Sequence, residues 1–113
     1  MSLQNNCHTT IINPQGRELT KPQKYADTLA KWQCDIAGAI KENLQGRTDI
    51  LVSTGGASYL KTSAPDAYLS CAALDVIAIH AYGVGDLTRD ALQPYVQKAQ
   101  KAGKRLIMQE WGM

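Results

Sequence analysis

The sequence predicts an α/β fold in which helices cover a parallel β-sheet. Three apolar segments of strand length alternate with three helical segments along the 113 residues. The strand segments are apolar throughout instead of alternating, which is typical of strands buried on both faces. Right-handed crossovers between such strands place their carboxyl ends at one edge of the sheet. Residues at the ends of these segments are therefore expected to meet at that edge.

The first helix is predicted over residues 21–45. Its apolar positions recur every three or four residues, so we expect one face to pack against the sheet. That face comprises Tyr25, Leu29, Trp32, Ile36, Ile40 and Leu44. Pro22 lies in the first turn, where its missing N–H has no partner to lose, and Gly46 follows the last turn.

Three segments have the composition of buried strands. Residues 50–52 are rich in β-formers and precede Gly55 and Gly56, and residues 75–82 are apolar, with β-branched side chains at Val76, Ile77 and Ile79. Residues 106–108 form a short apolar run near the end of the sequence. The predicted order is helix, strand, helix, strand, helix, strand.

Two shorter helices are predicted between these strands. Ser63, followed three residues later by Asp66, has the form of a capping box, so a helix is expected to run to about residue 73. Thr88 is a suitable cap for the next helix, in which Pro94 is expected to make the first turn irregular. The inner face of that helix is predicted to comprise Leu92, Tyr95, Val96 and Ala99.

The composition excludes several classes of function. Hydrophobic residues make up 44% of the chain and charged residues 19%, and the net charge is +2, which is ordinary for a globular protein. Lys and Arg are dispersed among acids, so we expect no nucleic-acid partner. No apolar run approaches the roughly 20 residues that cross a bilayer, and we expect no membrane partner. The first ten residues lack the pattern of a signal peptide.

The three cysteines do not have the spacing of metal ligands. Cys7, Cys34 and Cys71 are all far apart in the sequence. Cys34 lies on the helix face opposite the apolar stripe, where the arm carrying Cys7 would be an available cover. A Cys7–Cys34 disulfide is therefore a hypothesis, while Cys71 is expected to be a buried or idle thiol. No metal and no cofactor are predicted.

Reactive side chains are predicted at one edge of the sheet. His80 and Tyr82 lie at the end of the second strand, Glu110 at the end of the third, and Gly55 after the first. Taken singly, these would be read as a core histidine, a core aromatic residue and a surface acid, but their coincidence at one edge favours a site. Trp111 is expected either to wall a pocket or stack on a substrate ring, or to pack under helices.

The alternation of side chains along a strand refines this expectation. His80 and Tyr82 share one face of their strand, and Glu110 is expected on the same face of its strand as Leu106 and Met108. Two neighbouring parallel strands are thus predicted to hold a Glu, a His and a Tyr within reach of one another.

The segments "DVIAIHAYG" and "GKRLIMQEWG" resemble strands six and seven of the family 5 glycoside hydrolases, which are retaining (β/α)8-barrel enzymes that include cellulases and mannanases. "LVSTGG" resembles strand five, and "WQCDIAGAIKE" resembles the helix before it. The resemblance implies that Glu110 is the nucleophile, that Tyr82 donates a hydrogen bond to it, and that His80 positions the sugar and the carboxylates. Trp111 and Gly55 are expected to bind substrate.

The sequence also departs from that family. A retaining glycosidase needs a second carboxylate about 5 Å from the first, and in this family it is a Glu that follows Asn at the end of strand four. No Asn-Glu pair is present, Glu18 lies among turn-like residues, Glu42 belongs to a helix, and Asp75 lies at the opposite end of its strand. The strand-eight Trp and strands one to four are also missing from a barrel that takes around 250 residues.

The resemblance therefore implies parallel βα units that form part of a TIM (β/α)8 barrel, incomplete in this chain. Residues 1–21 are expected to form an arm and residues 22–113 a single partial-barrel domain. We expect an extracellular enzyme that cleaves β-linked polysaccharide of the glucan or mannan type, and a 113-residue chain that is inactive alone. Unpaired strand edges predict self-association.

One other class of function remains open from the sequence. A small flavodoxin-like module would bind a ligand or partner at its strand tips without catalysis. Its Gly55–Gly56 loop would be the phosphate-binding segment, although no nucleotide-binding motif of glycines accompanies it.

Overall fold

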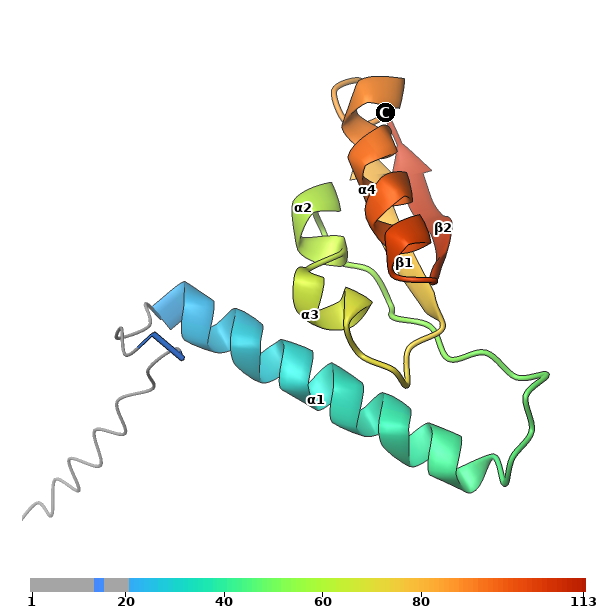
Figure 1. The fold of residues 1–113 in the computed structure, drawn as a ribbon. Helices are drawn as coiled ribbons and strands as arrows, with labels where there is room; N and C mark the ends of the chain where they lie inside the picture. Colours follow the sequence, from blue (N-terminus) through green and yellow to red (C-terminus); the bar gives the residue numbers. More distant parts are fainter. Residues whose placement is uncertain (1–13, 16–20) are drawn as a thin grey trace, which may run out of the picture.

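The computed structural model describes residues 14–15 and 21–113, and this part of the chain is an α/β arrangement of helices and a two-stranded parallel sheet (Figure 1). The α/β class predicted from the sequence is thereby confirmed. In chain order the elements are α1 (Lys21–Asn43), α2 (Leu60–Ser63), α3 (Asp66–Leu69), β1 (Val76–Tyr82), α4 (Arg89–Lys101) and β2 (Arg105–Gly112).

The centre of the fold is β1, which is buried along nearly its whole length. Ile77 is 0% exposed and Ile79 is 2% exposed. Their neighbours across the sheet are Leu106 and Met108 of β2, which pack against the same apolar core. Helix α4 connects the two strands and runs along the sheet, so β1, α4 and β2 form one βαβ unit (Figure 1).

The segment predicted as the first strand is extended but pairs with β1 at one point. Ser53 forms a single parallel bridge with Val76. One step further along, the Thr54 hydroxyl replaces a backbone carbonyl and accepts the Ala78 N–H at 2.8 Å. On the other side of the bridge the Val52 N–H donates to the Asp75 carboxylate, so side chains interrupt the backbone ladder both before and after Ser53 and no regular strand forms.

The helix predicted from Ser63 to about residue 73 is replaced by two single turns, α2 and α3. Ser63 is 0% exposed and does not cap a helix, because its hydroxyl bonds to the backbone of the preceding loop. Pro65 is the N-cap residue of α3 and supplies no side-chain cap. The capping-box prediction was wrong, because Ser63 satisfies backbone groups upstream of it instead.

Helix α4 begins as its cap predicts. The Thr88 hydroxyl accepts the Ala91 N–H at 3.1 Å. The helix is regular from Arg89, although Pro94 lies inside it, so the expectation of an irregular first turn was wrong. Pro94 removes one N–H from the hydrogen-bond ladder without ending the helix.

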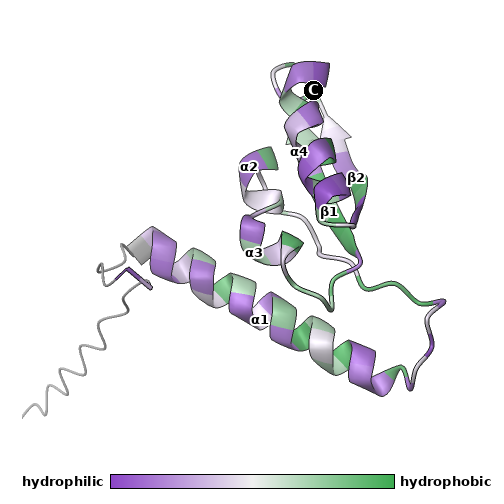
Figure 2. Ribbon diagram, viewed as in Figure 1, coloured by the Kyte–Doolittle hydropathy of each residue, from purple (hydrophilic) through white to green (hydrophobic). Residues whose placement is uncertain are grey.

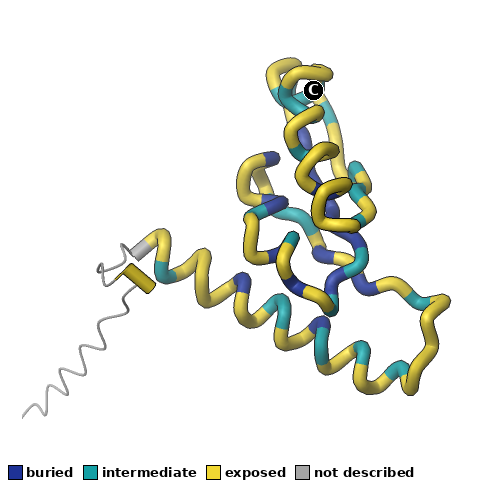
Figure 3. The backbone as a smooth tube through the Cα atoms, in the orientation of Figure 1, coloured by how far each residue is buried: buried dark blue, intermediate teal, exposed yellow. Residues whose placement is uncertain are grey.

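Helix α1 has nearly its predicted length, but its predicted inner face lies largely in solvent. Tyr25 is 71% exposed and Trp32 is 56% exposed, and Leu29, Ile36 and Ile40 are also exposed (Figures 2 and 3). The residues of α1 that are buried are small ones, Ala30 and Ala37. The helical period of the apolar residues was recognised correctly, but the prediction that this face packs against the sheet was wrong.

A disulfide explains how α1 is oriented. Cys34 is bonded to Cys71, which follows α3 and is 3% exposed. The predicted Cys7–Cys34 pairing was therefore wrong, and Cys7 lies outside the described residues. Because Cys34 lies away from the apolar stripe, this bond turns the opposite side of α1 toward the rest of the fold.

A partly exposed ion pair provides a second attachment for α1. Lys41 near the end of α1 contacts the carboxylate of Asp75, which also accepts the Val52 N–H at 2.8 Å. The Lys41 ammonium and then the Val52 N–H hold the pKa of Asp75 below its usual value. One carboxylate thus joins α1, the segment before Thr54 and the start of β1.

Candidate active site at the strand carboxyl ends

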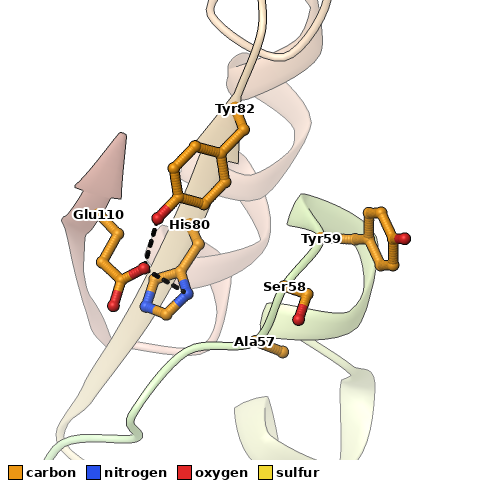
Figure 4. Close-up of a pocket in the computed structure, with 6 residues that line it drawn as sticks. All are labelled: Ala57, Ser58, Tyr59, His80, Tyr82 and Glu110. Carbon is orange, nitrogen blue, oxygen red and sulfur yellow. Dashed lines mark hydrogen bonds and ion pairs between the residues drawn. The ribbon is translucent and has the colours of Figure 1, made fainter. Parts of the chain in front are cut away.

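An open pocket of about 540 Å³ lies at the carboxyl ends of β1 and β2. Its size is in the range of ligand sites in proteins. Figure 4 shows the side chains around it, with Glu110 from β2 facing His80 and Tyr82 from β1. The lining residues are Ala57, Ser58, Tyr59, His80, Tyr82 and Glu110.

A β-bulge in β2 brings Glu110 to this pocket. Ile79 pairs with Met108, but His80 pairs with Glu110, so Gln109 is an extra residue in β2. Paired residues on neighbouring strands point to the same face, and Met108 points with Ile79 toward the core. The expectation that Glu110 shares the face of Leu106 and Met108 was wrong. If Gln109 paired with His80 in a regular register, Glu110 would pair with Ala81 and lie on the opposite side of the sheet from His80.

Tyr82 makes a shorter contact with the Glu110 carboxylate than His80 does. Its hydroxyl donates to Oε2 of Glu110 at 2.5 Å. This hydrogen bond, followed by desolvation and by the charge of the carboxylate, raises the pKa of Tyr82 above its ordinary value. Tyr82 therefore remains a donor through the neutral range of pH and fixes one oxygen of Glu110 at the pocket.

His80 lies between two acceptors of β2. Its Nε2 is 3.0 Å from Oε1 of Gln109, and its Nδ1 is 3.6 Å from Oε2 of Glu110. The His80 side chain is 10% exposed, so it is a nearly buried group in the lining of the pocket. The structure brings together the three side chains predicted as catalytic, His80, Tyr82 and Glu110.

The backbone of Gly56 packs against the His80 imidazole. Its φ is +77°, and a Cβ at this position would lie 2.2 Å from Nε2 of His80. No side chain fits there, so the backbone approaches the ring as closely as a glycine allows. The sequence indicated the right pair of glycines, but Gly55 was the one selected. A Cβ at Gly55 would meet no atom within 4 Å.

Ser63 connects the pocket wall to β1. Its hydroxyl donates to the Tyr59 carbonyl at 2.9 Å and accepts the backbone N–H groups of Ala57 and His80 at 3.1 and 3.4 Å. Sequence reasoning missed this role, and it also missed Gln109 and Gly56. Two of these gave a signal: the glycine pair was noticed but Gly55 was selected from it, and the serine was assigned to a cap.

The two residues predicted to bind substrate do not line the pocket. Trp111 pairs with Ala81, on the opposite face of the sheet from His80, and is 69% exposed. Gly55 is also absent from the lining. An exposed aromatic side chain does lie at the pocket, where Tyr59 is 71% exposed.

The chemistry of the pocket centres on one carboxylate. Glu110 is the only acid among the lining residues, and Tyr82 is a hydrogen-bond donor beside it. A carboxylate oriented in this way is suited to nucleophilic attack or to accepting a proton. In the described part of the chain, no group of three or more His, Cys, Asp or Glu side chains is arranged to hold a metal ion. Within the same residues, no helix combines the length and apolar composition needed to span a bilayer.

Comparison of the chain with models of protein families, with curated proteins and with solved structures finds no match. The resemblance to the family 5 glycoside hydrolases therefore depends on the residues quoted above and on the geometry of this pocket.

Proposed function

We propose that this chain is the nucleophile-bearing part of a retaining glycoside hydrolase that cleaves β-linked polysaccharide of the glucan or mannan type. The observation that carries the proposal is the contact of Tyr82 and His80 with Glu110 at the carboxyl ends of two parallel strands. In a (β/α)8 barrel the active site is built at this end of the strands. The βαβ unit and the parallel sheet are compatible with such a barrel.

In the proposed reaction a Glu110 oxygen attacks the anomeric carbon of the sugar. A bond forms between this oxygen and the anomeric carbon, while the bond from that carbon to the leaving-group oxygen breaks. The leaving oxygen takes a proton from an acid/base carboxylate that the pocket lining does not include, and water later hydrolyses the glycosyl ester. Tyr82 keeps the Glu110 carboxylate in its attacking orientation.

The Cys34–Cys71 disulfide supports an extracellular location for the proposed enzyme. Disulfides form and persist in oxidising compartments and are rare in the cytosol. A secreted enzyme would meet insoluble or polymeric glycans outside the cell.

The proposal is tested by trapping the glycosyl ester. A 2-deoxy-2-fluoro β-glucoside or β-mannoside with a dinitrophenyl leaving group needs no general acid, so the chain is expected to react with it slowly. Intact-mass measurement and peptide mapping should find one sugar on Glu110. Glu110→Gln should remain unlabelled, whereas Glu42→Gln, a matched change in α1, should label like the wild type.

Labelling at another residue, or equal labelling of Glu110→Gln, would show that Glu110 is not the nucleophile. Reversible binding of the sugar without a covalent adduct would favour the non-catalytic binding module. Unmodified polysaccharide should not be cleaved measurably, because general acid catalysis contributes about 10²–10⁴-fold in rate.

A further inference from the structure

We propose that Gln109 is a positioning residue that keeps the ring proton of neutral His80 on Nε2, so that the Nδ1 lone pair faces Glu110 and the pocket. The role of this lone pair, which is to accept a hydrogen bond from a substrate hydroxyl, depends on the proposed function. The position of the proton does not, because it is a property of the unliganded chain.

The β-bulge creates the contact that this proposal needs. Since two residues of β2 oppose His80, both Gln109 and Glu110 reach the same imidazole. A regular register would place a single side chain of β2 opposite His80. The extra residue therefore places the neutral amide oxygen of Gln109 beside Nε2, in addition to the Glu110 carboxylate beside Nδ1.

The two acceptors compete for one proton. A neutral imidazole carries its hydrogen on one nitrogen, and the partner of that nitrogen decides which tautomer is present. Gln109 Oε1 is 3.0 Å from Nε2, which is hydrogen-bonding distance, whereas Glu110 Oε2 is 3.6 Å from Nδ1, which is not. Glu110 is negatively charged and would attract the proton if Gln109 were absent, so Gln109 is the group that prevents the transfer.

The surroundings hold the ring in place for this competition. Gly56 leaves no space beside Nε2, and the His80 backbone N–H is bonded to Ser63. These contacts fix the His80 backbone and keep the ring from turning toward Gly56. Tyr82 already donates to the same Glu110 oxygen, so that oxygen does not depend on His80 for a donor.

The tautomer can be measured directly. Protein labelled with ¹⁵N at histidine contains two imidazoles, His8 and His80, and His8→Gln leaves only the second signal set. Nitrogen chemical shifts and couplings to the ring carbons distinguish a protonated nitrogen from an unprotonated one. Spectra are recorded at increasing pH until the nitrogen shifts no longer change, so that the tautomer is read from the neutral ring.

The wild type is expected to show the proton on Nε2. Gln109→Glu retains the acceptor and should give the same tautomer, whereas Gln109→Leu removes it and should transfer more than half of the population to Nδ1. Backbone amide spectra serve as the control that all three chains are folded alike.

The proposal is overturned if the wild type carries its proton on Nδ1, which would mean that the Gln109 amide nitrogen donates to Nε2. It is also overturned if Gln109→Leu leaves the proton on Nε2. Neither result depends on whether Glu110 can be glycosylated, so failure of this inference is separable from failure of the proposed function.

Discussion

Helix α1 and strand β1 both have an apolar sequence pattern, yet the apolar residues of α1 are largely exposed and those of β1 are buried. Five residues of the α1 stripe are exposed, whereas β1 is buried from Val76 to Ala81. The strand has neighbours on both sides, namely β2 and the segment at Ser53, while the helix is attached through a disulfide and an ion pair on other faces. Apolar periodicity thus identifies residues whose burial would be favourable, but whether they are buried depends on which surface the rest of the fold packs against them.

The exposed side of α1 borders an open edge. Ser53 directs its own backbone groups away from β1, because the bridge uses those of Val52 and Thr54. A small groove of about 80 Å³ lies between this edge and α1, and Trp32 and Ile36 contribute to its lining. These features support the predicted self-association, which stays a prediction.

The largest expected effect concerns the bond that holds α1. Replacing Cys34 or Cys71 by Ser opens a loop whose ends are 37 residues apart, and the chain-entropy model assigns such a loop about 4 kcal/mol of unfolding free energy. Urea unfolding followed by circular dichroism measures the loss. Cys7→Ser is the control and should unfold like the wild type. Equal destabilisation by Cys7→Ser would contradict the pairing.

A smaller effect is expected at the pocket, where two adjacent glycines allow a matched test. Gly56→Ala places a methyl group against His80 and forces a positive φ on a residue with a side chain, so we expect a loss of about 2–4 kcal/mol. Gly55→Ala meets no atom within 4 Å and should change the unfolding free energy little. Equal effects in thermal or urea unfolding would show that the ring is not held by Gly56.

The ion pair of α1 should give a pH-dependent effect. The folded-state pKa of Asp75 is lowered, so its stabilisation is full above the unfolded-state value of about 3.9 and is lost as the pH falls through the folded value. Asp75→Asn is expected to lose about 2 kcal/mol at pH 7. The difference between the two chains should vanish in acid. The exposed Asp49, which pairs with Arg47, provides a control, because Asp49→Asn should have no measurable effect.

The smallest effect on folding, and the most direct probe of the exposed stripe, is expected for Trp32→Ser combined with Ile36→Ser. Both side chains are exposed, so the unfolding free energy should change by less than about 0.5 kcal/mol. Light scattering of the wild type should show a mass that rises with concentration, and the double variant should show a smaller rise. Lys31→Gln, on the polar side of α1, should resemble the wild type. A wild type that stays monomeric at high concentration would contradict self-association.

Local patterns predicted the parts of the fold that depend on neighbours in the sequence. The Thr88 cap, the strand from Val76 and the extent of α1 all follow from residues a few positions apart. The partner of Cys34 could not be predicted, because it depends on which side of α1 faces the α3 loop. A cysteine's spacing in sequence carries no information about that orientation.

The candidate site was predictable in the same partial way. That His80, Tyr82 and Glu110 would meet followed from strand ends at one edge of a parallel sheet, and the structure brings them together. Their catalytic role stays a prediction. The reason that they meet was not predictable, because a regular alternation of side chains contains no sign of the extra residue Gln109.

The bulge has a consequence for how variants of this strand should be compared. A deletion of the single residue before Glu110 would leave the apolar composition of β2 and its pairing through Met108 unchanged. It would also leave Glu110 opposite His80, but it would remove the Gln109 oxygen that lies 3.0 Å from Nε2 of the imidazole. A variant strand can therefore keep the glutamate in register with the histidine and still lack the second acceptor, so the number of residues between Met108 and Glu110 has to be compared as well as the glutamate itself.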